Sequence, residues 1–73
     1  MEFSVVLRGY RIGEVDALVR LADDAIESQD PQARAEAAEA LRSASFRLGF
    51  RGYDRNQVDQ WRRRMLAALE LSF

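Results

Sequence analysis

The chain has 73 residues, contains no cysteine and no histidine, and carries a formal net charge of −1 at neutral pH. A chain this short buries only a modest core, so we expect a single small domain spanning residues 1–73 that gains stability from a partner. The missing residue types exclude disulfides, thiolate metal sites, and the commonest metal ligand and general base. We therefore expect no enzyme, no cofactor, no metal site and no small-molecule substrate.

The distribution of charge and apolar residues also limits the partners. The net charge argues against a dedicated nucleic-acid binder, but acidic residues are in excess over 1–30 and arginines over 46–73, so we expect the two halves to attract each other. No apolar run approaches the roughly 20 residues of a bilayer span, and the N-terminus does not resemble a signal peptide. A cytoplasmic protein is expected.

The sequence contains an internal repeat. Residues 3–20 align with residues 46–63 at an offset of 43. The identical pairs are Phe3 and Phe46, Arg8 and Arg51, Gly9 and Gly52, Tyr10 and Tyr53, Val15 and Val58, Asp16 and Asp59, and Arg20 and Arg63. Motif copy one spans residues 3–27, and motif copy two spans residues 46–71.

Each copy opens with alternating apolar residues, which predicts a short extended arm with one buried face. The alternating positions are Phe3, Val5 and Leu7 in copy one, and Phe46, Leu48 and Phe50 in copy two. Gly9 and Gly52 follow where the arm turns into a helix, so we expect a positive φ at both glycines.

An amphipathic helix follows in each copy, with apolar residues at the three-and-four spacing of one face. In copy one the face consists of Val15, Leu18, Val19, Ala22, Ala25 and Ile26, and in copy two of Val58, Trp61, Arg62, Met65, Ala68 and Leu69.

Capping residues predict where the helices begin. Asp54 and Gln57 fit a capping box, whereas Arg11 occupies the cap position of the first helix, so we expect Gly13 to cap it instead. Asp30 and Pro31 predict the start of a connecting helix over 31–44. Its narrow face of small residues comprises Ala33, Ala37, Leu41 and Ala44.

These elements predict a mostly α fold, or a small α+β fold, with two short arms or strands and three helices. An approximate internal two-fold should relate the two copies, because one copy alone could hardly bury its apolar face.

The order of these residues resembles the N-terminal domain of DivIVA, a bacterial cell-division and polarity protein, and its repeat-containing relatives. The segment from Phe50 to Asp59, FRGYDRNQVD, matches closely, with Phe46 at the upstream aromatic position. The segment from Leu7 to Asp16, LRGYRIGEVD, departs at Arg11, where the family usually has Asp. Together the matches cover roughly half of the chain.

The resemblance implies a non-enzymatic scaffold connected with bacterial cell division or polar growth. In DivIVA this region forms an intertwined dimer whose loops expose an aromatic residue beside an arginine; the aromatic inserts into the inner membrane leaflet and the arginine meets lipid phosphates. By position, Phe50 with Arg51 and Leu7 with Arg8 would make these contacts. A peripheral location at the inner face of the cell membrane follows from this likeness.

Two interpretations stay open at these positions. Phe50 and Leu7 belong to the alternating face, which favours the core, whereas the resemblance favours membrane insertion. Arg8 and Arg51 either bind a ligand or pair with the motif carboxylates of Asp16 and Asp59. In the second case Tyr10 and Tyr53 would cover the turns with their hydroxyls in water.

The charged clusters also have two interpretations each. The run from Arg62 to Arg64 beside Trp61 could contact nucleic acid or lipid, but a solvated helix face paired with the acidic half is the simpler account. Asp23, Asp24 and Glu27 could form a metal site, but a solvated surface is favoured.

The sequence thus predicts an adapter that binds a protein partner or itself, as a homodimer, and an anionic membrane surface. The alternative is a cytosolic dimerisation module that makes no membrane contact and recruits its partner through Trp61, Arg62 and Met65. Exposure of Phe50 favours the adapter, whereas burial of Phe50 with exposure of Trp61 or Phe73 favours the alternative.

Overall fold

The structure is a computed structural model and describes residues 3–71. Its elements are β1 (Val5–Leu7), α1 (Ile12–Ser28), α2 (Pro31–Ser43), β2 (Arg51–Tyr53) and α3 (Arg55–Leu71). The predicted fold class is confirmed, because three helices make up most of the chain and the two strands are short.

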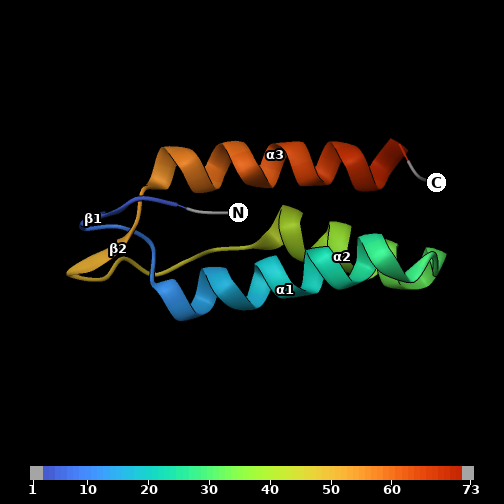
Figure 1. Ribbon diagram of the computed structural model, residues 1–73, viewed down its shortest axis with the longest axis horizontal. Helices are drawn as coiled ribbons and strands as arrows, with labels where there is room; N and C mark the ends of the chain where they lie inside the picture. The colour runs from blue at the N-terminus through green and yellow to red at the C-terminus, as the bar shows by residue number, and fades with distance from the viewer. Residues whose placement is uncertain (1–2, 72–73) are drawn as a thin grey trace.

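The helices lie beside one another and the two-stranded sheet sits at one end of them (Figure 1). Both α1 and α3 begin at the sheet and run away from it, and α2 packs against both. The molecule is elongated, with extents of 37 × 19 × 17 Å. The sheet end therefore collects the N-termini of two helices.

Helix α2 begins as predicted. The Asp30 side chain accepts a hydrogen bond from the Gln32 amide at 3.0 Å, and Pro31 occupies the first turn, where no amide donor is needed. The helix ends at Ser43, one residue earlier than predicted, because Ala44 is already extended.

The starts of α1 and α3 differ from each other. Asp54 Oδ1 accepts hydrogen bonds from the amides of Asn56 at 2.9 Å and Gln57 at 3.3 Å, which confirms the predicted cap. Gln57 does not return to Asp54 but accepts a bond from the amide of Ser4 at 2.6 Å. Arg11 provides no side-chain cap, and the predicted capping role of Gly13 is wrong because this residue lies inside α1.

The helices of both copies share one core, and Trp61 is the largest side chain in it, with 1% of its surface exposed. The ring of Phe3 meets the indole edge-on at a centroid distance of 6.0 Å. The buried apolar residues are Val15, Leu18, Ala22 and Ala25 from α1, Ala37, Ala38 and Leu41 from α2, and Val58, Trp61 and Leu69 from α3. The periodicity therefore predicted the buried faces of α1 and α3, except that Ala68, which was predicted on the apolar face of α3, is exposed.

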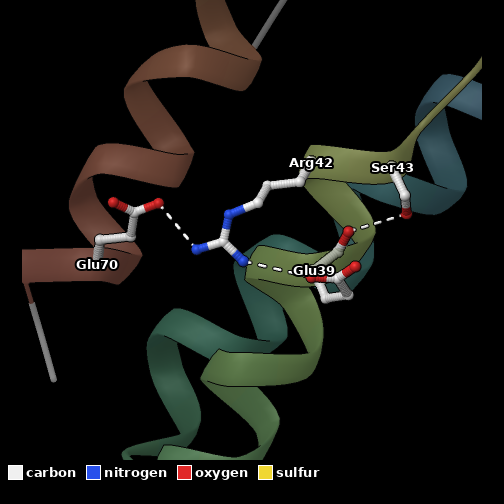
Figure 2. A network of polar contacts seen from close by, with 4 residues as sticks. All are labelled: Glu39, Arg42, Ser43 and Glu70. Carbon is white, nitrogen blue, oxygen red and sulfur yellow. Dashed lines mark hydrogen bonds and ion pairs between the residues drawn. The ribbon is translucent and has the colours of Figure 1, made fainter.

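A polar network joins α2 to α3 at the surface (Figure 2). The Arg42 guanidinium donates to Glu70 on α3 at 3.0 Å and to Glu39 on its own helix at 3.3 Å. Ser43 donates to the backbone carbonyl of Glu39 at 2.9 Å. Because these groups are exposed, we expect each ion pair to contribute under about 1 kcal/mol.

The sheet confirms the internal two-fold. Its antiparallel register pairs Val5 of copy one with Tyr53 of copy two. When the two copies are exchanged, the equivalent pair is Leu48 with Tyr10, and it forms a separate bridge. On the axis itself, the Tyr10 amide donates to the Tyr53 carbonyl at 3.0 Å and the Tyr53 amide to the Tyr10 carbonyl at 2.9 Å. The two motif copies therefore cross each other with their tyrosine backbones in the centre.

The predicted positive φ at Gly9 and Gly52 is wrong: no described glycine adopts one, and Arg8 takes the left-handed conformation instead, at φ 59°. The two glycines are needed for a different reason. A Cβ on Gly9 would overlap the backbone of Gly52, and a Cβ on Gly52 would overlap the backbones of Gly9 and Tyr10. The two backbones meet closely only because neither residue has a side chain.

We predict that Gly9→Ala or Gly52→Ala will lower the free energy of unfolding by several kcal/mol, because the clash falls on backbone that cannot move aside; ordinary overpacking already costs about 1–3 kcal/mol. Gly13→Ala is the matched control. It lies in α1 with open space around a new Cβ, and should stabilise the protein by about 0.5–1 kcal/mol. Urea unfolding followed by circular dichroism measures all three, and a native-like Gly9→Ala would contradict the close crossing.

Candidate functional site

The sheet brings together the two pairs that the resemblance singled out. Leu7 lies opposite Arg51 in the register, and the Arg8 amide donates to the Phe50 carbonyl at 2.9 Å. We call these four residues the sheet tip. Leu7 ends β1 and Arg51 begins β2, and the sheet of these two strands lies at the end of the molecule where α1 and α3 start (Figure 1). The internal two-fold thus places both copies of the pair in one site.

The interpretation that places Phe50 and Leu7 in the core is wrong. Phe50 is 83% exposed and Leu7 65% exposed, and Val5 and Leu48 on the same alternating faces are about half exposed. Only the first residue of each arm packs inward, with Phe3 at 5.2 Å from the ring of Tyr53. The reason is that the helices cover only the base of the sheet.

The motif tyrosines, and not the arginines, bind the motif carboxylates. Tyr10 donates to Asp59 Oδ1 at 3.2 Å, and Tyr53 donates to Asp16 Oδ1 at 2.9 Å. The predicted pairing of Arg8 and Arg51 with these carboxylates is therefore wrong, as is the placement of the tyrosine hydroxyls in water alone. The crossing carries each tyrosine to the helix of the other copy, so each hydroxyl meets a carboxylate from the opposite repeat.

This arrangement perturbs both phenols. Burial raises the pKa of Tyr10 above its ordinary value of 10.0, and the negative charge of Asp59 adds to the effect. The hydrogen bond to Asp16 is the main cause that raises the pKa of Tyr53 above 10.0. In each case the neutral phenol can donate to the carboxylate, whereas a phenolate would repel it.

The sheet end carries free positive charge. Arg8, Arg11, Arg51 and Arg55 are exposed, and none of them forms an ion pair or a side-chain hydrogen bond among residues 3–71. Arg8 and Arg55 line one hollow with Leu7, and Asp54 and Asp59 also line it. The side chain of Arg11 lies near Gly49 in the opposite arm. The N-termini of α1 and α3 add partial positive charge at this end. Apolar side chains and unpaired arginines therefore occupy the same surface.

The face of α3 that was predicted to recruit a partner, with Trp61, Arg62 and Met65, is not exposed. Trp61 is 1% exposed, and Met65 is half-buried and packs against the core. Arg62 donates to the Ala44 carbonyl at 2.8 Å and lies 3.7 Å from Asp59. The hypothesis that Trp61 recruits a partner is therefore wrong, because the periodicity that marked this face was that of the core. The same burial keeps Trp61 from stacking on a nucleic-acid base. Phe73 lies outside the residues that the structure describes.

The acidic cluster on α1 and the arginines on α3 do not pair with each other within residues 3–71. Asp23, Asp24 and Glu27 on α1, and Arg63 and Arg64 on α3, are exposed and form no ion pair within the described part of the chain. The predicted pairing of the basic run with the acidic half is thus wrong, because Arg62 pairs with Asp59 of its own half and Arg63 and Arg64 form no ion pair among residues 3–71. Arg47 and Glu14, at 3.7 Å, form an ion pair that does join the two halves. Over residues 3–71, no cluster of acidic side chains is arranged to hold a metal ion.

Within residues 3–71, none of the helices has the length and apolar content needed to cross a bilayer. No protein-family model, curated protein or solved structure matches this chain. The candidate site is thus defined by the geometry of the sheet tip.

The raised phenol pKa values predict a loss of stability at alkaline pH. Below about pH 10 both folded and unfolded chains keep the phenol protons and the stabilisation is complete; above it the unfolded chain ionises first, and the stabilisation is lost as the pH passes the raised folded pKa values. The chain has no lysine or cysteine, so tyrosines alone titrate in this range.

Replacing both residues, Tyr10→Phe with Tyr53→Phe, should lower stability at neutral pH by about 0.5–1.5 kcal/mol for each hydroxyl and remove most of the alkaline loss. Urea midpoints measured across the alkaline range test this. An alkaline loss that is equally steep in the double variant would show that the tyrosine–aspartate bonds are not its source.

Proposed function

We propose that this chain is a non-enzymatic, DivIVA-like adapter that attaches peripherally to the anionic inner face of the cell membrane through the sheet tip, and serves bacterial cell division or polar growth. The exposure of Phe50 beside Arg51, at the sheet end of the molecule, is the observation that carries this proposal. The link to division rests on the resemblance of the two motif copies.

The chemistry of the sheet tip suits a lipid interface. An aromatic ring and a leucine can enter the boundary between headgroups and acyl chains, while the neighbouring guanidinium groups stay at the level of the phosphates. Full burial of a phenylalanine contributes about 1.5–3 kcal/mol, and each arginine near an anionic surface about 1 kcal/mol. One tip therefore supports reversible attachment and not permanent anchoring.

The internal repeat supports the same function. Leu7 with Arg8 and Phe50 with Arg51 reach the surface together because the copies cross, so a single chain presents the two contact pairs that the resemblance assigns to a dimer. Two contacts on one rigid body bind more tightly than either alone.

The competing function is a cytosolic dimerisation module without membrane contact. The burial of Trp61 removes the surface on which that hypothesis relied. If the native chain does not bind anionic vesicles in the following experiment, a cytosolic module that binds its partner through another surface is the function that is left.

We predict that the native chain will co-sediment with vesicles containing anionic lipid and that added salt will weaken the binding. Phe50→Ser should weaken partitioning by roughly 10- to 100-fold, through the loss of apolar burial, and Arg51→Gln by roughly fivefold, through the loss of one charge. The native chain should stay in the supernatant with vesicles of neutral lipid alone.

Leu21→Ser is the matched control, because Leu21 is 43% exposed but lies on α1, away from the sheet tip. It should bind like the native chain at a protein concentration where the chain is monomeric, and circular dichroism should show every variant folded. The membrane proposal is contradicted if the native chain does not bind anionic vesicles. It is also contradicted if a folded Phe50→Ser variant binds as well as the native chain.

A further inference from the structure

Two helix faces of opposite charge remain uncovered on this molecule. The outer side of α1 carries the acidic face, defined by Asp23, Asp24 and Glu27, with Arg20 among them; the outer side of α3 carries the basic face, defined by Arg63 and Arg64. Neither face is neutralised by an ion pair within residues 3–71. Glu70, the acidic neighbour on α3, is already held by Arg42 of α2 (Figure 2).

The acidic face borders an apolar groove. The groove lies between α1 and the segment that follows α2, and its lining includes Ala17, Leu21, Ala44 and Phe46. Leu21 is 43% exposed there, and Asp24 lies three residues further along on the same side of the helix. Such a groove with an acidic border suits a helix that presents small residues and the apolar stems of arginines.

The other copy of the motif has the complementary residues at the matching positions. Arg64 stands where α1 has Leu21, and Ala67 stands where α1 has Asp24. Both Arg64 and Ala67 are exposed on α3. Arginine stems cover apolar surface while their guanidinium groups remain free to meet carboxylates.

We infer that the α1 groove with its acidic face binds the basic face of α3 from a second copy of this chain. The apolar stem of Arg64 packs on Leu21 of the neighbour, and the guanidinium groups meet Asp24 and Glu27. A net charge of −1 leaves little overall repulsion between copies. A membrane or nucleic acid would fit poorly, because its phosphates repel the acidic face.

The two faces lie on different helices, α1 and α3, and their residues are exposed on both. A contact between the α1 face of one copy and the α3 face of another leaves one face of each kind free, so further copies can add to the pair. This inference does not depend on membrane binding, but such an assembly would gather several sheet tips and strengthen their attachment by avidity.

Sedimentation velocity without vesicles tests the inference, over micromolar to millimolar concentrations at low and high salt. The native chain should exceed its 8.4 kDa mass as concentration rises and return toward it in high salt. Leu21→Ser with Asp24→Ser should weaken association at least tenfold, and Arg63→Ser with Arg64→Ser should do the same. Glu36→Ser is the control, because it removes an exposed acidic residue from α2, outside both faces. This variant should associate like the native chain.

Mixing the two double variants gives the decisive result, because one keeps a native α3 face and the other a native α1 face. The mixture should form a 1:1 pair and nothing larger. A native chain that stays monomeric at every concentration overturns the inference. An Arg63 and Arg64 variant that still dimerises alone overturns it too, because the contact would then join like faces, and so does a mixture of folded variants that forms no pair.

Discussion

The close backbone contact between Gly9 and Gly52 is the constraint on which the rest of the structure depends. It lets the two motif copies cross at a single point, with Tyr10 and Tyr53 exchanging backbone hydrogen bonds on the axis. From there each arm runs along the helix of the other copy. The Asp54 amide at the start of α3 donates to the Ser4 carbonyl at 2.8 Å, and the Arg11 amide before α1 donates to the Arg47 carbonyl at 3.0 Å. In each repeat, the amide just before the helix therefore finds its acceptor in the arm of the other repeat.

The crossing also explains why similar halves carry different residues. At one equivalent position Gln57 accepts a hydrogen bond from the Ser4 amide, and at the other Glu14 accepts one from the Arg47 amide at 3.1 Å. Both positions need a hydrogen-bond acceptor for the amide of the opposite arm. At position 14 the acceptor is a carboxylate, and Glu14 therefore also forms an ion pair with the Arg47 side chain. Because α2 has no duplicate, the symmetry must break where this helix packs, and the small residues Ala37 and Ala38 accommodate the close approach.

The helices were predictable from the sequence because their signals are local. The spacing of Val15, Leu18 and Ala22 reports which side of a helix is apolar, and a helix of this length has to bury that side somewhere. Asp30 and Asp54 identify helix starts because the acceptor and the donors that it satisfies lie within a few residues of each other.

The sheet tip was not predictable in the same way. Alternation shows that Val5 and Leu7 share a face, but whether another element covers this face depends on where distant helices begin. A glycine that permits a positive φ and a glycine that permits a close backbone approach also look alike in sequence. The bond between Tyr10 and Asp59 spans 49 residues, and a duplicated motif cannot reveal whether its tyrosine meets its own aspartate or the copy's.

An exposed apolar strand such as β1 is ordinarily a hazard, because free edges invite pairing with other chains. Here the left-handed turn at Arg8 ends β1 after three residues, which leaves too little edge for extended pairing. Arg8 and Arg51 place charge beside Leu7 and Phe50 at the same point, which discourages apolar aggregation. The same arginines supply the attraction to anionic surfaces on which the proposed attachment relies, so protection of the sheet edge and recognition of a membrane can be achieved by one pair of side chains.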